Sequence, residues 1–287
     1  MVMNRLSDYL SMTKPRAMGA VLVTAAAGYL VAVGGAWQPL LLLDLLLGAG
    51  FAGGGSIVLN QFIERRHDLK MKRTRERPLP AGRVSPTEAL VYGVALAVLG
   101  TVWLAWRVNT ITAVLGALSV VTYVLVYTPL KRISPLNTAV GAVPGALPPM
   151  MGWTAATGSL DAEAWVLFAI LFLWQFPHFL AISWLYREDY ARAGYAMWSG
   201  RDADGSLVAR KMVTQSALLM AVSLVPVGLS MVGLGYAAGA MLLGTGLLLL
   251  TILFRGSPTA RSASWVLKGS VVHIALLMGL LVLDSMS

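Results

Sequence analysis

Long apolar runs alternate with short polar connections along almost the whole chain. A helix of about 20 mostly apolar residues spans the hydrocarbon core of a bilayer, and the runs are close to that length. The pattern therefore predicts an all-α, polytopic membrane helix bundle, built as a single domain over residues 1–287. We predict nine transmembrane helices, over residues 16–37, 40–63, 86–106, 109–128, 135–155, 163–186, 212–233, 236–254 and 264–284.

The composition supports a membrane protein and narrows its chemistry. Hydrophobic residues make up 57% of the chain and charged residues only 12%, whereas soluble proteins average about 25% charged residues. Cysteine is absent, which excludes disulfides, thiolate nucleophiles and zinc–thiolate sites. The first residues show neither the pattern of a cleavable secretory signal nor that of an organelle-targeting peptide. We therefore expect a multi-pass protein of the prokaryotic plasma (inner) membrane.

The basic residues predict the orientation in the membrane. The formal net charge is +9, and the predicted spans divide the connections into two alternating sets. One set holds every lysine and arginine of the chain except Arg107. Cytoplasmic loops of membrane proteins are enriched in these residues, so we predict a cytoplasmic N-terminus and an outside C-terminus. The positive charge thus reports topology, and without interleaved aromatic residues it does not indicate nucleic-acid binding.

Two predicted cytoplasmic connections, residues 64–85 and 187–211, are long and mix carboxylates with arginines. The second span leads into the first of them with Asn60, Glu64 and Asp68, which share one face if the helix continues beyond the span. Three such oxygen ligands suit Mg2+, which takes few protein ligands and also binds substrate phosphates. The alternative is a solvated charged loop. Against it, Asn60 and Glu64 stand at the end of an apolar span, where polar side chains are costly without a cavity or a partner.

Further charged residues extend this candidate site. Arg73 and Arg77, again four residues apart, are candidates to hold the diphosphate oxygens that a metal leaves open. Asp189, in the second long connection, follows a span that descends to the same surface, so we predict that it lies opposite Asp68. Two acidic clusters in this arrangement are suited to clamp one diphosphate through magnesium.

The end of the fourth span carries Tyr123 and Tyr127 at a spacing that puts both on one helix face. Lys131 and Arg132 follow directly, and Lys131 is a candidate to hold phosphate. An interfacial aromatic belt with anchoring cations explains these residues equally well.

The three histidines allow different interpretations. His178 lies inside the membrane, in a segment that Pro177 should kink or loosen. It is either a contact for an acceptor substrate or a buried histidine that hydrogen-bonds to a neighbouring helix. His273, alone in the middle of the last span, is predicted to be structural, and His67 is predicted to be a loop residue.

Several stretches, spread over most of the chain, form a recognisable set. They are Thr13-Lys14-Pro15-Arg16, Asn60 to Leu79, Tyr127-Thr128-Pro129-Leu130-Lys131-Arg132, Gly145-Ala146-Leu147-Pro148-Pro149 with Gly152-Trp153, Pro177-His178-Phe179, and Asp189-Tyr190-Ala191-Arg192-Ala193-Gly194 with Met197. In this order they resemble the UbiA superfamily of intramembrane prenyltransferases, and within it the protoheme IX farnesyltransferase (heme O synthase) branch. The superfamily usually has two aspartates four residues apart in its second acidic motif. Here Leu185 and Ala193 stand at those distances, which leaves Asp189, with Glu188 beside it.

The resemblance implies a function and a site. The implied reaction is transfer of a farnesyl group from farnesyl diphosphate to a vinyl group of heme b (protoheme IX), which forms heme O for terminal oxidase assembly. The implied site residues are Asn60, Glu64, Asp68 and Asp189 for Mg2+, Arg73, Arg77, Lys131 and Arg132 for diphosphate, and His178, Tyr123 and Tyr127 for the acceptor pocket. The resemblance further implies association with a downstream heme-modifying enzyme.

The resemblance also leaves alternatives for the function. One alternative is a UbiA-type enzyme with an aromatic or quinone-precursor acceptor. From a different class, the alternative is a membrane transporter or assembly protein, although carboxylates at one surface rather than at the midplane argue against transport.

Overall fold

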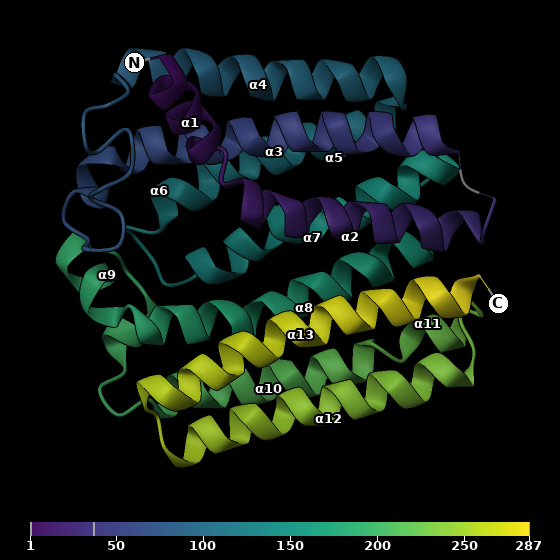
Figure 1. Cartoon of the computed structure of the whole chain (residues 1–287). Helices are drawn as coiled ribbons and strands as arrows, with labels where there is room; N and C mark the ends of the chain where they lie inside the picture. Colours follow the sequence, from purple (N-terminus) through teal and green to yellow (C-terminus); the bar gives the residue numbers. More distant parts are fainter. Residues whose placement is uncertain (1, 37, 287) are drawn as a thin grey trace.

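The computed structural model describes residues 2–36 and 38–286, and all regular structure in these ranges is helical (Figure 1). The longer helices run side by side along one common direction. The elements are α1 (Val2–Met12), α2 (Pro15–Val33), α3 (Pro39–Asp68), α4 (Pro86–Arg107), α5 (Thr110–Val121), η1 (Thr122–Tyr127), α6 (Thr128–Leu130), α7 (Asn137–Thr157), α8 (Ala162–Leu185), α9 (Arg187–Ala193), η2 (Trp198–Arg201), α10 (Ser206–Val222), α11 (Val225–Gly228), α12 (Leu234–Gly256) and α13 (Ala260–Ser285).

Eight helical segments within the described ranges are long and apolar enough to cross a membrane. They correspond to all the predicted spans except 135–155, which is α7. This helix has 21 residues but carries three prolines, and most of its side chains are buried against other helices. Because α7 faces protein rather than lipid, it does not need the hydropathy of the others. The predicted end of the first span at Trp37 lies outside the described residues.

Two helices extend beyond the predicted spans on the side of the long connections. Helix α3 continues to Asp68, so the connection between α3 and α4 begins later than predicted. Helix α10 begins at Ser206 rather than at residue 212, and α9 and η2 lie inside the second long connection. The start of α4 is fixed by a capping box, in which the Ser85 hydroxyl accepts from the Glu88 N–H and the Ser85 N–H donates to the Glu88 carboxylate at 2.8 Å.

Glycines allow the closest helix contacts. Between α3 and α4, a Cβ atom on Gly55 would lie 2.5 Å from the Ala97 nitrogen, and one on Gly100 would overlap the backbone of Ala52. Between α2 and α7, a Cβ on Gly28 would overlap the carbonyl of Pro149. Backbones that approach this closely are typical of membrane helix pairs, where small residues maximise van der Waals contact.

Helix α7 joins the two halves of the bundle. It packs against α2 and α5 on one side and against α8 on the other. Its prolines remove backbone donors. The Ser119 hydroxyl donates at 3.3 Å to the Pro144 carbonyl, which has lost its helical donor to Pro148. The Gln175 amide donates to the Ala142 carbonyl at 2.8 Å. These bonds tie α7 to α5 and α8 at the centre of the protein.

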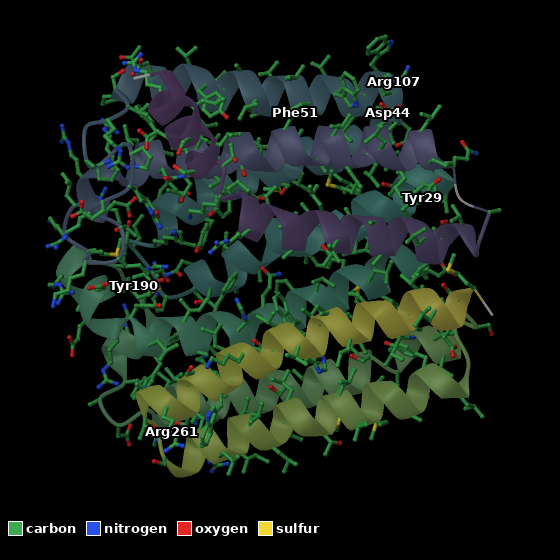
Figure 2. All side chains as sticks on the ribbon, in the orientation of Figure 1. Tyr29, Asp44, Phe51, Arg107, Tyr190 and Arg261 are labelled. Carbon is green, nitrogen blue, oxygen red and sulfur yellow. The ribbon has the colours of Figure 1, made fainter. Side chains whose placement is uncertain are left out.

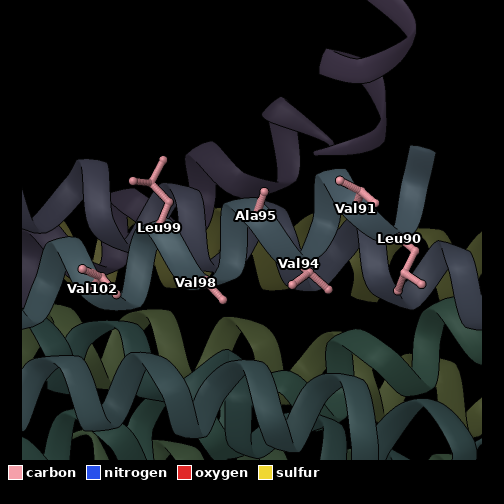
Figure 3. Close-up of a pocket in the computed structure, with 7 residues that line it drawn as sticks. All are labelled: Leu90, Val91, Val94, Ala95, Val98, Leu99 and Val102. Atoms are coloured by element: carbon pink, nitrogen blue, oxygen red, sulfur yellow. The ribbon is translucent and has the colours of Figure 1, made fainter. Parts of the chain in front are cut away.

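The outward face of α4 carries an apolar groove (Figure 3). Val91 and Val98 are 63% and 56% exposed, as expected for a surface in contact with lipid tails. The groove contains no charged side chain, so it is not the place for diphosphate chemistry. Its lining residues are Leu90, Val91, Val94, Ala95, Val98, Leu99 and Val102.

The two ends of the bundle differ in charge (Figure 2). Tyr190 and Arg261 lie at the end that holds α9, whereas Asp44 and Arg107 lie at the opposite end. Arg107 pairs there with Asp44 at 3.1 Å. Helix α1 and the end of α13 also lie at opposite ends, which agrees with an odd number of crossings. The orientation relative to the cytoplasm stays a prediction.

Candidate functional site

The last turns of α3 carry three buried polar side chains. Asn60, Glu64 and Asp68 are 2%, 6% and 0% exposed, and because α3 is continuous to Asp68 they share one face. A solvated charged loop would leave these side chains in water, so the geometry does not support that alternative. Buried carboxylates are stable only with partners.

Each of the three side chains has a partner from another segment. Lys131 Nζ lies 2.7 Å from Glu64 Oε1, and Arg77 NH1 lies 2.8 Å from Asp68 Oδ2. The Asn60 amide donates to the Thr128 hydroxyl at 2.9 Å. The site is therefore built where the end of α3 meets α6 and the connection that follows α3.

One carboxylate oxygen is left without a partner. Asp68 Oδ1 is buried and makes no hydrogen bond to any described residue. The described residues also contain no group of three His, Cys, Asp or Glu side chains placed to hold a metal by themselves. Mg2+ is commonly bound by one or two carboxylates plus substrate phosphates, so an unpartnered Asp68 oxygen beside Glu64 fits this ion better than a metal held by protein alone.

A short π-helix positions Lys131. In η1 the helix widens before Pro129, which has no N–H to offer the preceding turn. The Tyr123 carbonyl accepts both the Thr128 N–H and, at 2.7 Å, the Thr128 hydroxyl. The rings of Tyr123 and Tyr127 are 5.3 Å apart, which agrees with the predicted shared face.

Lys131 lies between a carboxylate and an aromatic ring. Its ammonium group lies 4.5 Å from the Tyr127 ring centroid, in addition to its ion pair with Glu64. Burial alone would lower the pKa of Lys131, but the charge and hydrogen bond of Glu64, together with Tyr127 and Tyr123, outweigh burial and raise the pKa well above its ordinary value. Lys131 is thus a permanent cation of the site, while its neighbour Arg132 is exposed on the surface.

The two predicted diphosphate arginines of the first connection have different surroundings. The segment after Asp68 forms turns rather than helix, so the four-residue spacing does not put Arg73 and Arg77 on one face. Arg77 pairs with Asp68. Arg73 is exposed and lies over the Tyr186 ring, 4.8 Å from its centroid.

The second acidic segment lies at the same end of the bundle. Asp189, in α9, is 8% exposed and forms an ion pair with Arg192, one turn further on. Met71 of the first connection packs in one apolar cluster with Tyr195, so the two long connections meet. No hydrogen bond or ion pair among the described residues joins Asp189 to Asp68, and their opposition across the site stays a prediction.

The histidines occupy three different environments. His178 Nδ1 lies 3.0 Å from the Ser270 hydroxyl of α13, and the His178 ring stacks on Trp174 at 4.8 Å. The hydrogen bond to a neighbouring helix, which was one of the two alternatives, is therefore present. His273 is 2% exposed within α13. His67 was predicted to be a loop residue, and this was wrong, because α3 continues past it and its ring stacks on Tyr195.

The structure adds Lys14 to the candidate site. Burial and the nearby charges of Arg77 and Lys131 together lower its pKa to about 7, against the smaller opposing effect of the site's carboxylates. Lys14 directly precedes α2 and has φ 49°. Pro15 disfavours the right-handed α conformation at this position. The Gln61 amide donates to the Met12 carbonyl at 2.6 Å and ties this turn to α3.

Sequence reasoning assigned Lys14 only to topology and gave Tyr195 no role. For Lys14 the signal was its motif with Pro15 and Arg16, which the resemblance already singled out. For Tyr195 no spacing rule exists, since the contact depends on how two distant connections pack.

The site combines buried carboxylates with the basic side chains of Arg77, Lys131 and Lys14 at one end of a membrane bundle. Residues 21–277 match the model of the UbiA prenyltransferase family. The chain belongs to this family. It is a polytopic membrane prenyltransferase, as the sequence predicted.

Individual relatives agree with the match. The chain is 44% identical to a protein of Solibacter usitatus (strain Ellin6076) named protoheme IX farnesyltransferase, over 97% of this chain and 99% of the relative. A solved structure of a digeranylgeranylglyceryl phosphate synthase superposes with a TM-score of 0.82, at 16% identity and over 99% of both chains. A UbiA homolog from Archaeoglobus fulgidus bound to GPP and Mg2+ has a TM-score of 0.68, at 15% identity, over 98% of this chain and 100% of that one. The two structures establish the fold.

Proposed function

We propose that this protein transfers a farnesyl group from farnesyl diphosphate to a vinyl group of heme b and so forms heme O, in the plasma membrane of a bacterium. The observation that carries the proposal is the buried acidic face of α3, paired with Arg77 and Lys131, in a chain 44% identical to a protein named protoheme IX farnesyltransferase. The bacterial source of that relative supports the plasma membrane. Heme O then serves terminal oxidase assembly.

In this proposal Asn60, Glu64, Asp68 and Asp189 hold Mg2+. The unpartnered Asp68 oxygen and the burial of all four side chains support the assignment, as does the Mg2+ bound to the Archaeoglobus fulgidus homolog. When bound, the ion neutralises charge on the diphosphate and stabilises it as a leaving group.

The cations Lys131 and Arg77 gain a second partner when the substrate binds. Lys131 and Arg77 are held by carboxylates in the free protein. A diphosphate gives both a second anionic partner, and it also relieves their repulsion with Lys14. These charges are in position before the bond breaks, so little reorganisation is needed as negative charge develops. Arg73 and Arg132, exposed at the rim, attract the substrate.

The prenyl group reacts in an apolar environment. The bond between the allylic carbon and the diphosphate oxygen breaks, and its electron pair leaves with the diphosphate. The vinyl carbon of heme attacks the allylic cation, and water adds to the new cation with loss of a proton. The helix bundle keeps bulk water from the first cation, which would otherwise be captured before transfer.

His178, Tyr123 and Tyr127 line the acceptor side in this proposal. His178 has its Nδ1 oriented by Ser270 and its ring held against Trp174. A fixed ring orientation is what a contact with a flat macrocycle requires. Unchanged heme affinity and turnover in His178→Ala would remove this residue from the pocket.

The decisive experiment follows product mass. Purified protein is incubated with heme b, farnesyl diphosphate and Mg2+. We expect heme that carries one farnesyl group and one added water, with at least a hundredfold loss of rate in Asp68→Ala or EDTA, since a metal supplies several kcal/mol to such reactions. Asp44→Asn is the matched control, because Asp44 is also a buried, arginine-paired aspartate of α3 but lies at the other end.

The outcomes separate the alternatives. If heme stays unmodified while an aromatic acceptor is prenylated, the proposed diphosphate site would still hold, but heme would be rejected as the acceptor. If no acceptor leads to consumption of the prenyl diphosphate, the proposed prenyl transfer would be rejected.

A further inference from the structure

Tyr195, in the connection between α9 and η2, has a buried hydroxyl that lies near the Glu64 carboxylate but forms no hydrogen bond of normal geometry with any described residue. The side chain is only 7% exposed. Buried polar groups are nearly always hydrogen-bonded, so an unpartnered donor of this kind suggests a partner from outside the chain.

The Tyr195 ring is held beside the candidate diphosphate site. It stacks on His67 of α3 with the ring centroids 5.7 Å apart and 27° between the planes. The Lys131 ammonium group lies 5.9 Å from the Tyr195 centroid, and Tyr190 contacts the ring at 6.0 Å. Three segments therefore fix one aromatic ring next to the cation that pairs with Glu64.

The backbone around Tyr195 is fixed to the same cation-bearing segment. The Ala196 N–H donates to the Lys131 carbonyl at 2.7 Å, and the Asn137 amide donates to the Ala196 carbonyl at 2.8 Å. Tyr195 and Lys131 thus keep a constant relation, and a ligand that reaches one of them meets the other without any rearrangement of the loop.

The Tyr195 hydroxyl is a neutral hydrogen-bond donor, because a tyrosine is protonated at physiological pH. It lies near the Glu64 carboxylate, but no hydrogen bond of normal geometry joins the two. Lys131 and Arg77 are held by carboxylates, whereas this donor has no well-formed bond to break before it binds an anion.

We propose that Tyr195 is a further diphosphate-binding residue, whose hydroxyl donates a hydrogen bond to a diphosphate oxygen beside Lys131. The inference rests on the proposed function, since it deepens the description of the same site. A neutral donor adds a directed bond to the leaving group without adding charge to a region that already holds the cations Lys131 and Arg77.

The test measures binding of inorganic pyrophosphate in the presence of Mg2+ by the purified full-length protein. Tyr195→Phe removes only the unpartnered oxygen, so the melting temperature should not change. We expect pyrophosphate binding about tenfold weaker or more, the usual effect of a hydrogen bond to a charged group. Tyr236→Phe is the matched control, because Tyr236 also has a buried hydroxyl without a partner but belongs to the apolar core of the C-terminal half.

The results distinguish this inference from the proposed function. Equal pyrophosphate affinity in wild type and Tyr195→Phe, or equal losses in Tyr195→Phe and Tyr236→Phe, would overturn the role of Tyr195. Tyr195→Leu, which keeps an apolar side chain against Met71, must show at least the same loss. A wild type that binds pyrophosphate but leaves heme unmodified contradicts the acceptor assignment alone, and the ratio of pyrophosphate affinities still decides the role of Tyr195.

Discussion

At the scale of single residues, the candidate site consists of buried carboxylates that form ion pairs with protein cations. Glu64 and Asp68 are buried, and each is paired with a cation from another segment. Breaking such a pair from one side leaves an uncompensated buried charge, which costs about 3–5 kcal/mol. Substitutions of the carboxylates and of their cations therefore affect folding as well as activity, and melting temperatures belong beside every activity measurement.

If the site binds diphosphate as proposed, Lys14 should make this binding depend on pH. Its pKa is lowered to about 7 from an ordinary 10.5, so at pH 8 most of the free protein has a neutral Lys14. A bound diphosphate favours the ammonium form and raises this pKa. Between the two pKa values, binding therefore takes up a proton. Calorimetry of magnesium pyrophosphate binding at pH 8, in buffers of different ionisation enthalpy, measures this uptake.

Lys14→Arg is the control for the proton measurement, because a guanidinium keeps its charge throughout this pH range. The uptake should disappear in this variant. The same uptake in Lys14→Arg would assign the proton to another group.

At the scale of elements, helix ends and helix contacts carry the function. The extension of α3 to Asp68 aligns the three polar side chains, and the π-helical turn before Pro129 turns Lys131 toward them. The length of α3 was left open by the sequence, because helical propensity does not decide where a helix with charged last turns ends. The π-helix was not foreseen, since its signal is a single proline near the end of a span.

The contact between α3 and α4 should be sensitive to small additions. Gly100→Val places a branched side chain where a Cβ already overlaps the Ala52 backbone, and overpacking of this kind costs about 1–3 kcal/mol or more. We expect a lower melting temperature in detergent. Gly246→Val on α12, where nothing lies within 4 Å of the added Cβ, should leave the melting temperature within a few degrees of the wild type. Equal melting temperatures for the two variants would show that α3 and α4 can move apart without loss of stability.

At the scale of the whole molecule, sequence reasoning predicted the architecture well and the site in part. The membrane helix bundle and the prenyltransferase family are confirmed. Both could be predicted because hydropathy and sequence motifs are properties of single segments of the chain. Hydropathy also describes α7 least well, since that helix lies inside the protein. The roles of Arg73 and Tyr195 depend on how two connections far apart in the chain pack together, and no local pattern carries that information.

The orientation of the molecule can be tested directly because the chain has no cysteine. A single cysteine at Leu160, between α7 and α8, should react with a membrane-impermeant maleimide in intact cells. One at Ser257, between α12 and α13, should react only after the membrane is opened. These results follow if the basic connections are cytoplasmic. The reverse labelling pattern would invert the predicted topology.

The pairing of each acidic side chain with a protein cation also has a consequence for selectivity in the cell. Where free divalent ions exceed the prenyl diphosphate in concentration, an acidic cluster with no internal counterions would be saturated by those ions alone. Here Lys131, Arg77 and Arg192 already compensate Glu64, Asp68 and Asp189. A bare metal ion must displace a cation that then has no anion, whereas a metal–diphosphate complex supplies both charges together. If these carboxylates hold the metal as proposed, the protein should respond to the concentration of the complex rather than to that of the free ion.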